Sequence, residues 1–189
     1  MLRRVGPVVL VAALAFAPAA SAAKKKTVKL APKGATTLAL SDGAAAALKS
    51  LGISAAPLKP ARAGEKGIAF PITTGKLDAK TYAGTIKHSG GLSLTRGATR
   101  VDLRNFTINV DGAPDLTARV GRARVSILDL DLSDAKIAAS GRKLTIAGVK
   151  ATLTDDAAGA LNAAFGTTAF QEGLELGTAT VSGRAAKRK

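Results

Sequence analysis

The sequence contains no cysteine and no tryptophan, and it has one histidine and one tyrosine in 189 residues. Without cysteine the chain can form neither a disulfide bond nor a thiolate metal site. A catalytic Ser–His pair could use only His88, because no other histidine exists. Neither a G-x-S-x-G elbow nor a glycine-rich phosphate-binding motif occurs. The sequence therefore predicts a protein that is not an enzyme.

The first 22 residues have the pattern of a secretory signal peptide. Arg3 and Arg4 precede an apolar run that prolines interrupt, and the small residues Ala20-Ser21-Ala22 follow it. The run is short for a membrane span, and an uncleaved N-terminal anchor is the alternative. We expect cleavage near Ala22 and a secreted or cell-envelope-associated protein.

Positive charge gathers at the two ends of the chain, whose net charge is +15. We expect residues 23–36 and 183–189 to form basic tails. The body of the chain, residues 34–183, has a net charge of only +4. Such tails are either simply solvated or make salt-sensitive contacts with anionic cell-wall polymers or a membrane surface. Nucleic acid is not expected as a partner, because aromatic residues for base stacking are few.

Residues 37–182 are expected to form a single β-rich domain. Apolar and polar residues alternate in short segments such as "GIAFPI" at 67–72, with Gly, Asp or Pro between the segments. The alternation changes phase near Arg104-Asn105, between Ile127 and Leu128, and at Gly148, as β-bulges would produce. The fold class predicted is mainly β with two short helices, in an antiparallel sandwich or a barrel-like domain.

The two helices are expected within 37–53 and 150–166. Each follows a short strand and begins at a Ser/Thr-Asp pair, Ser41-Asp42 and Thr154-Asp155, which is typical of an N-cap with acid in the first turn. The likeness of the two segments indicates either an internal repeat or two unrelated alanine-rich helices. The Pro/Gly-rich segment 54–67 between helix and sheet is expected to be an exposed, mobile connector.

Two groups of residues raise the question of a metal site. Asp129, Asp131 and Asp134 could suggest calcium, but the first two alternate with leucines, as on the solvated face of a strand. Tyr82 and His88 would lie about 20 Å apart on one extended strand, which is too far for both to bind one iron. Each of them alone remains a candidate, since phenolate and imidazole both serve as axial haem ligands.

Three segments of the chain resemble the HtaA-type domains of bacterial haem uptake. They are "AGTIKHSGGLSL", "VDLRNFTINV…LTARV" and "ATLTDDAAGALNAAFGTTAFQEGLELGTATV", and together they lie within residues 78–181. The resemblance implies a β-rich exported fold that exchanges haem at or near the cell surface. It places His88 on the family's strand histidine, which assists a haem-ligating tyrosine near the start of the domain.

The corresponding start of this chain, "TTLALSDGAAAALKSLGI" at 36–53, contains no tyrosine. The candidate ligand-binding residues are therefore His88 and Tyr82, with His88 as the candidate metal ligand and haem as the candidate cofactor. The function expected is that of a non-catalytic binding domain that binds or relays haem, or another flat apolar ligand. The alternative is a structural cell-envelope domain that contacts anionic wall polymers through its basic tails.

Overall fold

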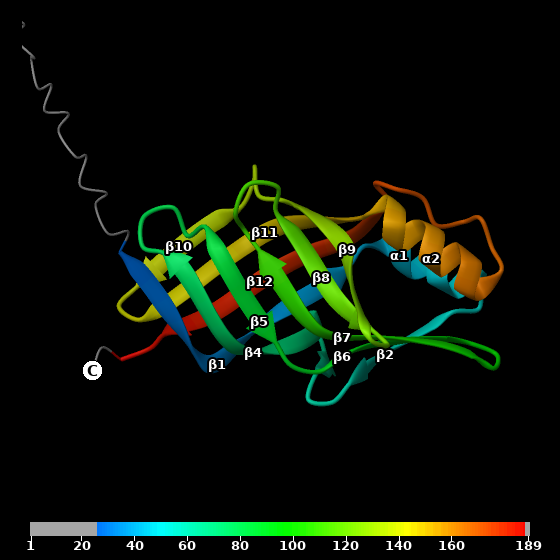
Figure 1. Ribbon diagram of the computed structural model, residues 1–189, viewed down its shortest axis with the longest axis horizontal. Coiled ribbons are helices and arrows are strands. Elements are labelled where there is room, and N and C mark those ends of the chain that lie inside the picture. The colour runs from blue at the N-terminus through cyan, green and yellow to red at the C-terminus, as the bar shows by residue number, and fades with distance from the viewer. Residues whose placement is uncertain (1–25, 188–189) are drawn as a thin grey trace, which may run out of the picture.

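Eight antiparallel strands close into a barrel in the computed structural model, which describes residues 26–187 (Figure 1). In their order around the barrel they are β1 (Thr27–Leu40), β4 (Gly67–Asp78), β5 (Gly84–His88), β7 (Thr99–Asn109), β8 (Asp115–Val120), β9 (Ala123–Asp131), β11 (Lys143–Leu153) and β12 (Glu175–Ala185). The ring closes because β12 pairs with β1 and β8 pairs with β7. The predicted mainly β, antiparallel class is confirmed, and its form is a barrel.

Four further strands add to this barrel at its edges. Strands β2 (Ser54–Leu58) and β6 (Gly91–Arg96) extend β7 into a three-stranded arm, while β3 (Arg62–Gly64) pairs with β4 and β10 (Lys136–Ser140) pairs with β11. The segment 54–67 was expected to be a connector, and that prediction is wrong because the segment contains β2 and β3. Pro57 is compatible with β2 because this strand lies at the edge of the sheet, where a missing N–H is tolerated.

Both helices, α1 (Asp42–Ser50) and α2 (Asp155–Phe165), lie at the same end of the barrel (Figure 1). The Ser41 hydroxyl accepts a hydrogen bond from the Ala44 N–H at 3.1 Å, and the Thr154 hydroxyl accepts one from the Ala157 N–H at 3.2 Å. These bonds satisfy N–H groups that the first turn of a helix leaves unpaired. Both predicted N-caps are confirmed.

The three predicted changes of phase are β-bulges. The pairing register shifts between Arg104 and Thr107 on β7, between Ile146 and Val149 on β11, and beside Ile127 on β9, which is the extra residue there. Both residues at the β9 shift, Ile127 and Leu128, are buried. Each bulge thus turns the apolar side chains on both of its sides toward the barrel interior.

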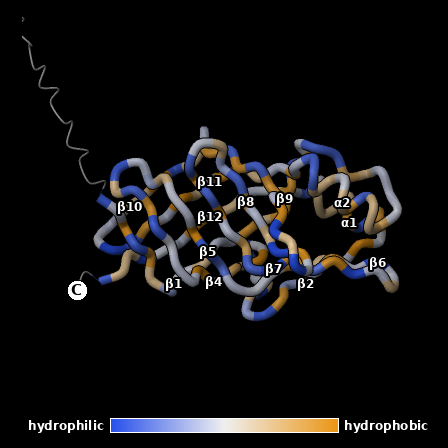
Figure 2. Tube along the Cα trace, in the orientation of Figure 1, coloured by the Kyte–Doolittle hydropathy of each residue, from blue (hydrophilic) through white to orange (hydrophobic). Residues whose placement is uncertain are grey.

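The barrel interior is filled by aliphatic side chains and a few phenylalanines. Figure 2 shows apolar and polar residues alternating along the strands, as expected where one face of each strand lies inside. Leu77, Ile86 and Leu153 are the largest side chains that are fully buried, and small residues such as Ala118 and Ala151 lie between the larger ones. The core is therefore made largely without aromatic bulk.

The two ends of the described chain belong to the barrel. Residues 27–36, which we expected in a basic tail, form the first part of β1 and pair with β4 and β12, and β12 itself runs to Ala185. The predicted signal peptide, its cleavage near Ala22, and residues 23–25 and 188–189 of the predicted tails lie outside the described residues. Within residues 26–187, no helix combines the length and the apolar composition needed to cross a membrane.

Candidate functional site

The structure does not bring the two candidate ligands, Tyr82 and His88, together. His88 ends β5 and pairs with Ile72, whereas Tyr82 precedes β5 in the turn that follows Asp78. Six residues along β4 separate Ile72 from Asp78, a distance of about 20 Å at the usual strand rise. The expectation that they are not a ligand pair agrees with this geometry, although Tyr82 lies outside the strand on which we had placed it.

Tyr82 has an unusual backbone for a bulky residue. Its φ angle is +58°, in the left-handed region that such residues seldom adopt. The turn is held by Asp78, whose Oδ1 accepts hydrogen bonds from the N–H groups of Lys80 and Thr81. The Tyr82 side chain is half-buried and packs against the core. It therefore adds an aromatic contact to the apolar core.

His88 points into the barrel and is only 4 % exposed. Its Nε2 lies 2.7 Å from the Thr36 Oγ1, and its Nδ1 lies 3.3 Å from the Phe106 carbonyl oxygen. A carbonyl oxygen can only accept, so Nδ1 carries the proton and Nε2 accepts the hydrogen bond that the Thr36 hydroxyl donates. The imidazole thus joins β1, β5 and β7 from inside, and both of its nitrogens are occupied.

Burial also fixes the charge of this histidine. Removal of the ring from water lowers the pKa of His88 from 6.5 to about 4, and the hydrogen bond to Phe106 opposes this shift only in part. The ring is therefore neutral at physiological pH. A neutral imidazole with both nitrogens bonded to protein atoms is well suited to hold strands together.

A hydroxyl beside an imidazole is also the arrangement of a catalytic nucleophile and its base. Thr36 and His88 have this geometry, but each is only 4 % exposed. The cavity next to Thr36 has a volume of about 80 Å³, well below the roughly 300 Å³ at which small-molecule sites begin. Both side chains are therefore shielded from molecules of substrate size in this structure.

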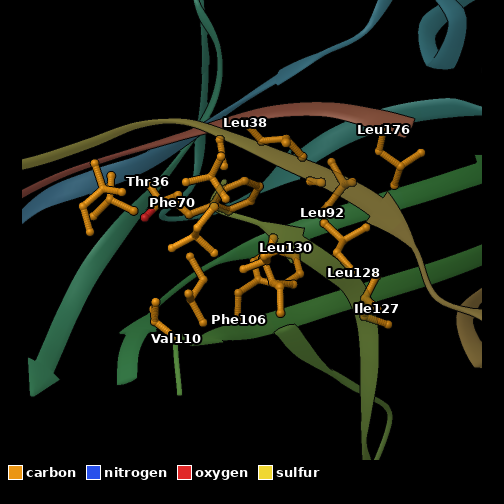
Figure 3. Close-up of a pocket in the computed structure, with 18 of the residues that line it drawn as sticks. Thr36, Leu38, Phe70, Leu92, Phe106, Val110, Ile127, Leu128, Leu130 and Leu176 are labelled. Carbon is orange, nitrogen blue, oxygen red and sulfur yellow. The ribbon is translucent and has the colours of Figure 1, made fainter. Parts of the chain in front are cut away.

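Thr36 is the one polar residue that lines this cavity, whose walls are otherwise apolar (Figure 3). Phe70 and Phe106 meet there edge to face, with ring centroids 4.8 Å apart and planes at 82°. Leu38, Leu92 and Leu176 line it and are only partly buried. An apolar space of this size stays dry in other proteins and admits no more than a very small apolar molecule.

The acidic residues that raised the question of calcium do not gather into a site. Asp129 and Asp131 are exposed on β9 with buried Leu130 between them, as the alternation indicated. The Asp131 carboxylate accepts a hydrogen bond from the Ser133 N–H, and this bond lowers its pKa. Among residues 26–187, no group of three or more His, Cys, Asp or Glu side chains could hold a metal ion.

The family model for HtaA matches residues 30–176, which is most of the chain. The chain belongs to the HtaA family. A search of the curated proteins found no match. The recognition of an HtaA-type domain from the three sequence segments is therefore confirmed, and the match extends further toward the N-terminus than those segments do.

Solved structures of this family share the fold. The C-terminal domain of HtaA from Corynebacterium glutamicum superposes with a TM-score of 0.65 at 16% identity, covering 84% of this chain and 99% of that one. A histidine-to-alanine variant of that domain, crystallised as a domain-swapped dimer, gives 0.55 at 16% identity, with coverage of 77% and 94%. The haem-binding protein HtaB from the same organism gives 0.46 at 13% identity, with coverage of 86% and 97%. At these identities the first two similarities establish the fold alone.

The described residues do not fit a haem whose iron is bound by His88. Iron would have to displace either the Thr36 hydroxyl or the Phe106 carbonyl from the imidazole, and the porphyrin would have to enter the barrel. The cavity of about 80 Å³ has no room for it. Metal ligation by His88, and ligand binding by His88 and Tyr82, stay predictions that this geometry does not favour.

Sequence reasoning missed the two partners of His88. Thr36 lies 52 residues before it and Phe106 lies 18 residues after it, so no local spacing connects the three. Thr36 does open the segment in which the family resemblance implies a tyrosine. The hydroxyl that meets the histidine in this chain is therefore a threonine hydroxyl inside the barrel.

Proposed function

We propose that this chain is a non-catalytic haem-binding domain in which His88 holds the barrel together and makes no bond to iron. Membership of the HtaA family over residues 30–176 supports haem as the ligand, because the family takes part in bacterial haem uptake. The observation that carries the role of His88 is the pair of hydrogen bonds that occupies both of its ring nitrogens.

Exclusion of the porphyrin from the barrel has a consequence for how haem is held. Haem would bind to the outside of the domain, as suits a protein that relays haem at the cell surface to another carrier. Weak binding favours such a relay, because a ligand that must be passed on has to dissociate. We assign no iron bond to any described residue.

A haemin titration followed at the Soret band tests this function. We expect the wild-type chain to shift the band, and we expect His88→Asn to give a shift of the same position and size. Thr36→Val is the matched control, since it breaks the same buried hydrogen bond but leaves the imidazole intact. If His88 were the iron ligand, His88→Asn alone would change the band.

Two results would contradict the proposal. A wild-type chain that leaves the haemin spectrum unchanged would remove haem as the ligand. A folded His88→Asn protein that loses the shift, beside a Thr36→Val protein that keeps it, would restore His88 as an iron ligand. Circular dichroism of each variant establishes that the barrel is intact before the titration is interpreted.

A further inference from the structure

Three arginines lie in one row across three neighbouring strands of the barrel. Arg104 on β7 is directly opposite Arg119 on β8, and Arg119 is directly opposite Arg124 on β9. Residues directly opposite each other in antiparallel strands point to the same face, and all three are exposed. We call this row the arginine strip.

The surroundings of the arginine strip add to its charge. Arg122 lies in the turn between β8 and β9, and Arg100 lies further along β7. Arg100 and Arg104 share the carboxylate of Asp102, which lies 2.8 Å from the Arg100 Nε and 3.1 Å from an Arg104 nitrogen. The Arg100 guanidinium holds the pKa of Asp102 down at about 2, so this carboxylate is ionised. Residues 100–124 thus carry five arginines against three acids, Asp102, Asp111 and Asp115, and only Asp102 forms an ion pair with these arginines among the described residues.

Like charges directly opposite each other destabilise a sheet. The row therefore costs folding free energy that an alternation of opposite charges would not cost. The overall charge of the chain does not account for this row of arginines, because the segment 34–183 has a net charge of only +4. Residues 100–124 contain five arginines and no lysine, so the excess is both local and of one residue type.

One end of the strip is fixed in place by the fold. The Arg124 Nη1 donates hydrogen bonds to the Asn105 carbonyl, the Thr107 hydroxyl and the Thr117 hydroxyl at 3.3, 3.2 and 3.0 Å. Asn105 presents this carbonyl because the β7 bulge places it at a φ of +52°. For Arg119, no ion pair exists with any residue between 26 and 187. The middle arginine therefore has its donors available for a ligand.

We propose that the arginine strip binds a linear polymer of phosphate groups that runs across β7, β8 and β9. Guanidinium groups bind phosphate through paired N–H donors, and arginine is suited to this geometry better than lysine. Neighbouring strands are about 4.8 Å apart, so the three residues span about 10 Å. This length exceeds one phosphate and requires successive groups along a chain.

The same surface fits other anionic partners less well. Ile137 on β10 is the one large apolar side chain that is exposed among the described residues, so the strip has no apolar neighbour to insert into a lipid bilayer. Residues 100–124 contain a single aromatic residue, Phe106, which is buried, so no ring is available to stack on a nucleic-acid base.

The test measures the affinity of the full chain for inorganic polyphosphate as a function of salt. The strip variant is Arg119→Glu with Arg122→Glu. The control variant is Lys143→Glu with Arg184→Glu, an equal change of charge at two basic residues elsewhere on the barrel, directly opposite each other on β11 and β12. The basic N-terminal end is the same in all three proteins. The control alone changes the C-terminal end, at Arg184, so a contribution of that end to binding would count against the proposal.

We expect the strip variant to bind at least about tenfold more weakly than wild type, and the control variant to stay within about twofold. The single substitution Arg119→Ala perturbs the fold less than the double charge reversal does. It should lower the slope of log affinity against log salt concentration by about 1. Thermal unfolding of each variant separates a loss of binding from a loss of structure.

Several outcomes would overturn the proposal. An equal loss in the strip and control variants would mean that only net charge matters, and no binding by the wild type would remove the site. Tighter binding to phosphatidylglycerol vesicles or to polyglutamate than to polyphosphate would assign the surface to a membrane or to an acidic protein. Haemin binding plays no part in this experiment, so the two proposals stand or fall separately.

Discussion

The hydrogen bond between His88 and Thr36 should appear as a coupling free energy in unfolding experiments. His88→Leu removes the ring and leaves the Thr36 hydroxyl and the Phe106 carbonyl without their partner inside the barrel. Each unpaired buried group costs about 1–3 kcal/mol, so the free energy of unfolding should fall by about 2–6 kcal/mol. That is a large part of the 5–15 kcal/mol that holds a typical domain folded.

Thr36→Val produces the complementary loss, because Nε2 of His88 then has no donor. The double variant lacks both the hydroxyl and the imidazole, so this hydrogen bond leaves no unpaired group behind. Its loss of unfolding free energy should therefore be smaller than the sum of the losses in the two single variants, by about 1–3 kcal/mol. Urea unfolding followed by circular dichroism measures all four corners of this cycle. Thr36→Ser keeps the hydroxyl and serves as the control with a much smaller effect.

Additivity of the two substitutions would refute this reasoning. Distant, independent sites add within about 0.5 kcal/mol, so a coupling below that value would mean that the two side chains do not meet in solution. An unchanged m-value in all four proteins is required for the comparison, because it shows that the variants unfold from equally compact states.

Three further predictions concern pH, capping and glycine. Since His88 titrates near pH 4 when folded and near 6.5 when unfolded, stability that is present above pH 6.5 should be lost as the pH falls toward 4. The wild type should lose about 3 kcal/mol more than His88→Leu over that range in urea unfolding. Thr154→Ala should cost about 1–2 kcal/mol in the same assay, because the hydroxyl caps α2 and also donates to the Ser126 carbonyl at 2.8 Å; Thr154→Ser should retain most of this. Gly177→Ala should lower the melting temperature by several degrees, because a Cβ there would overlap the Ala39 carbonyl oxygen, whereas Gly159→Ala in α2 should raise it, since nothing lies within 4 Å.

Much of the fold could be predicted because its signals are local. The cap residues Ser41 and Thr154 precede alanine-rich runs, and the phase changes near Arg104-Asn105 and Gly148 lie within single strands. Burial on one face of a strand imposes such patterns on the sequence directly. The choice between a sandwich and a barrel depends on the pairing of β7 with β8 and of β12 with β1, and no local pattern records those pairings.

The candidate site depended on contacts that the sequence does not display. Alternation on β5 places His88 on the same face as Ile86, which is buried, so the inward orientation of the ring could have been expected. Its partner Thr36 could not, because the two residues come together only through the pairing of β1 with β4 and of β4 with β5, and no local pattern records these registers. The arginine strip was hidden for the same reason, since Arg104, Arg119 and Arg124 become a row only once the registers of β7, β8 and β9 are known.

An NMR titration of the His88 ring tests the central claim most directly, because the chain has one histidine and its ring signals need no assignment by mutation. Long-range ¹H–¹⁵N spectra report both the tautomer and the pKa of the imidazole. We predict a neutral ring protonated at Nδ1, with no titration until the pH falls to about 4. A ring that is protonated at Nε2, or that titrates near its ordinary pKa of 6.5, would contradict the account and would leave His88 open to bind iron.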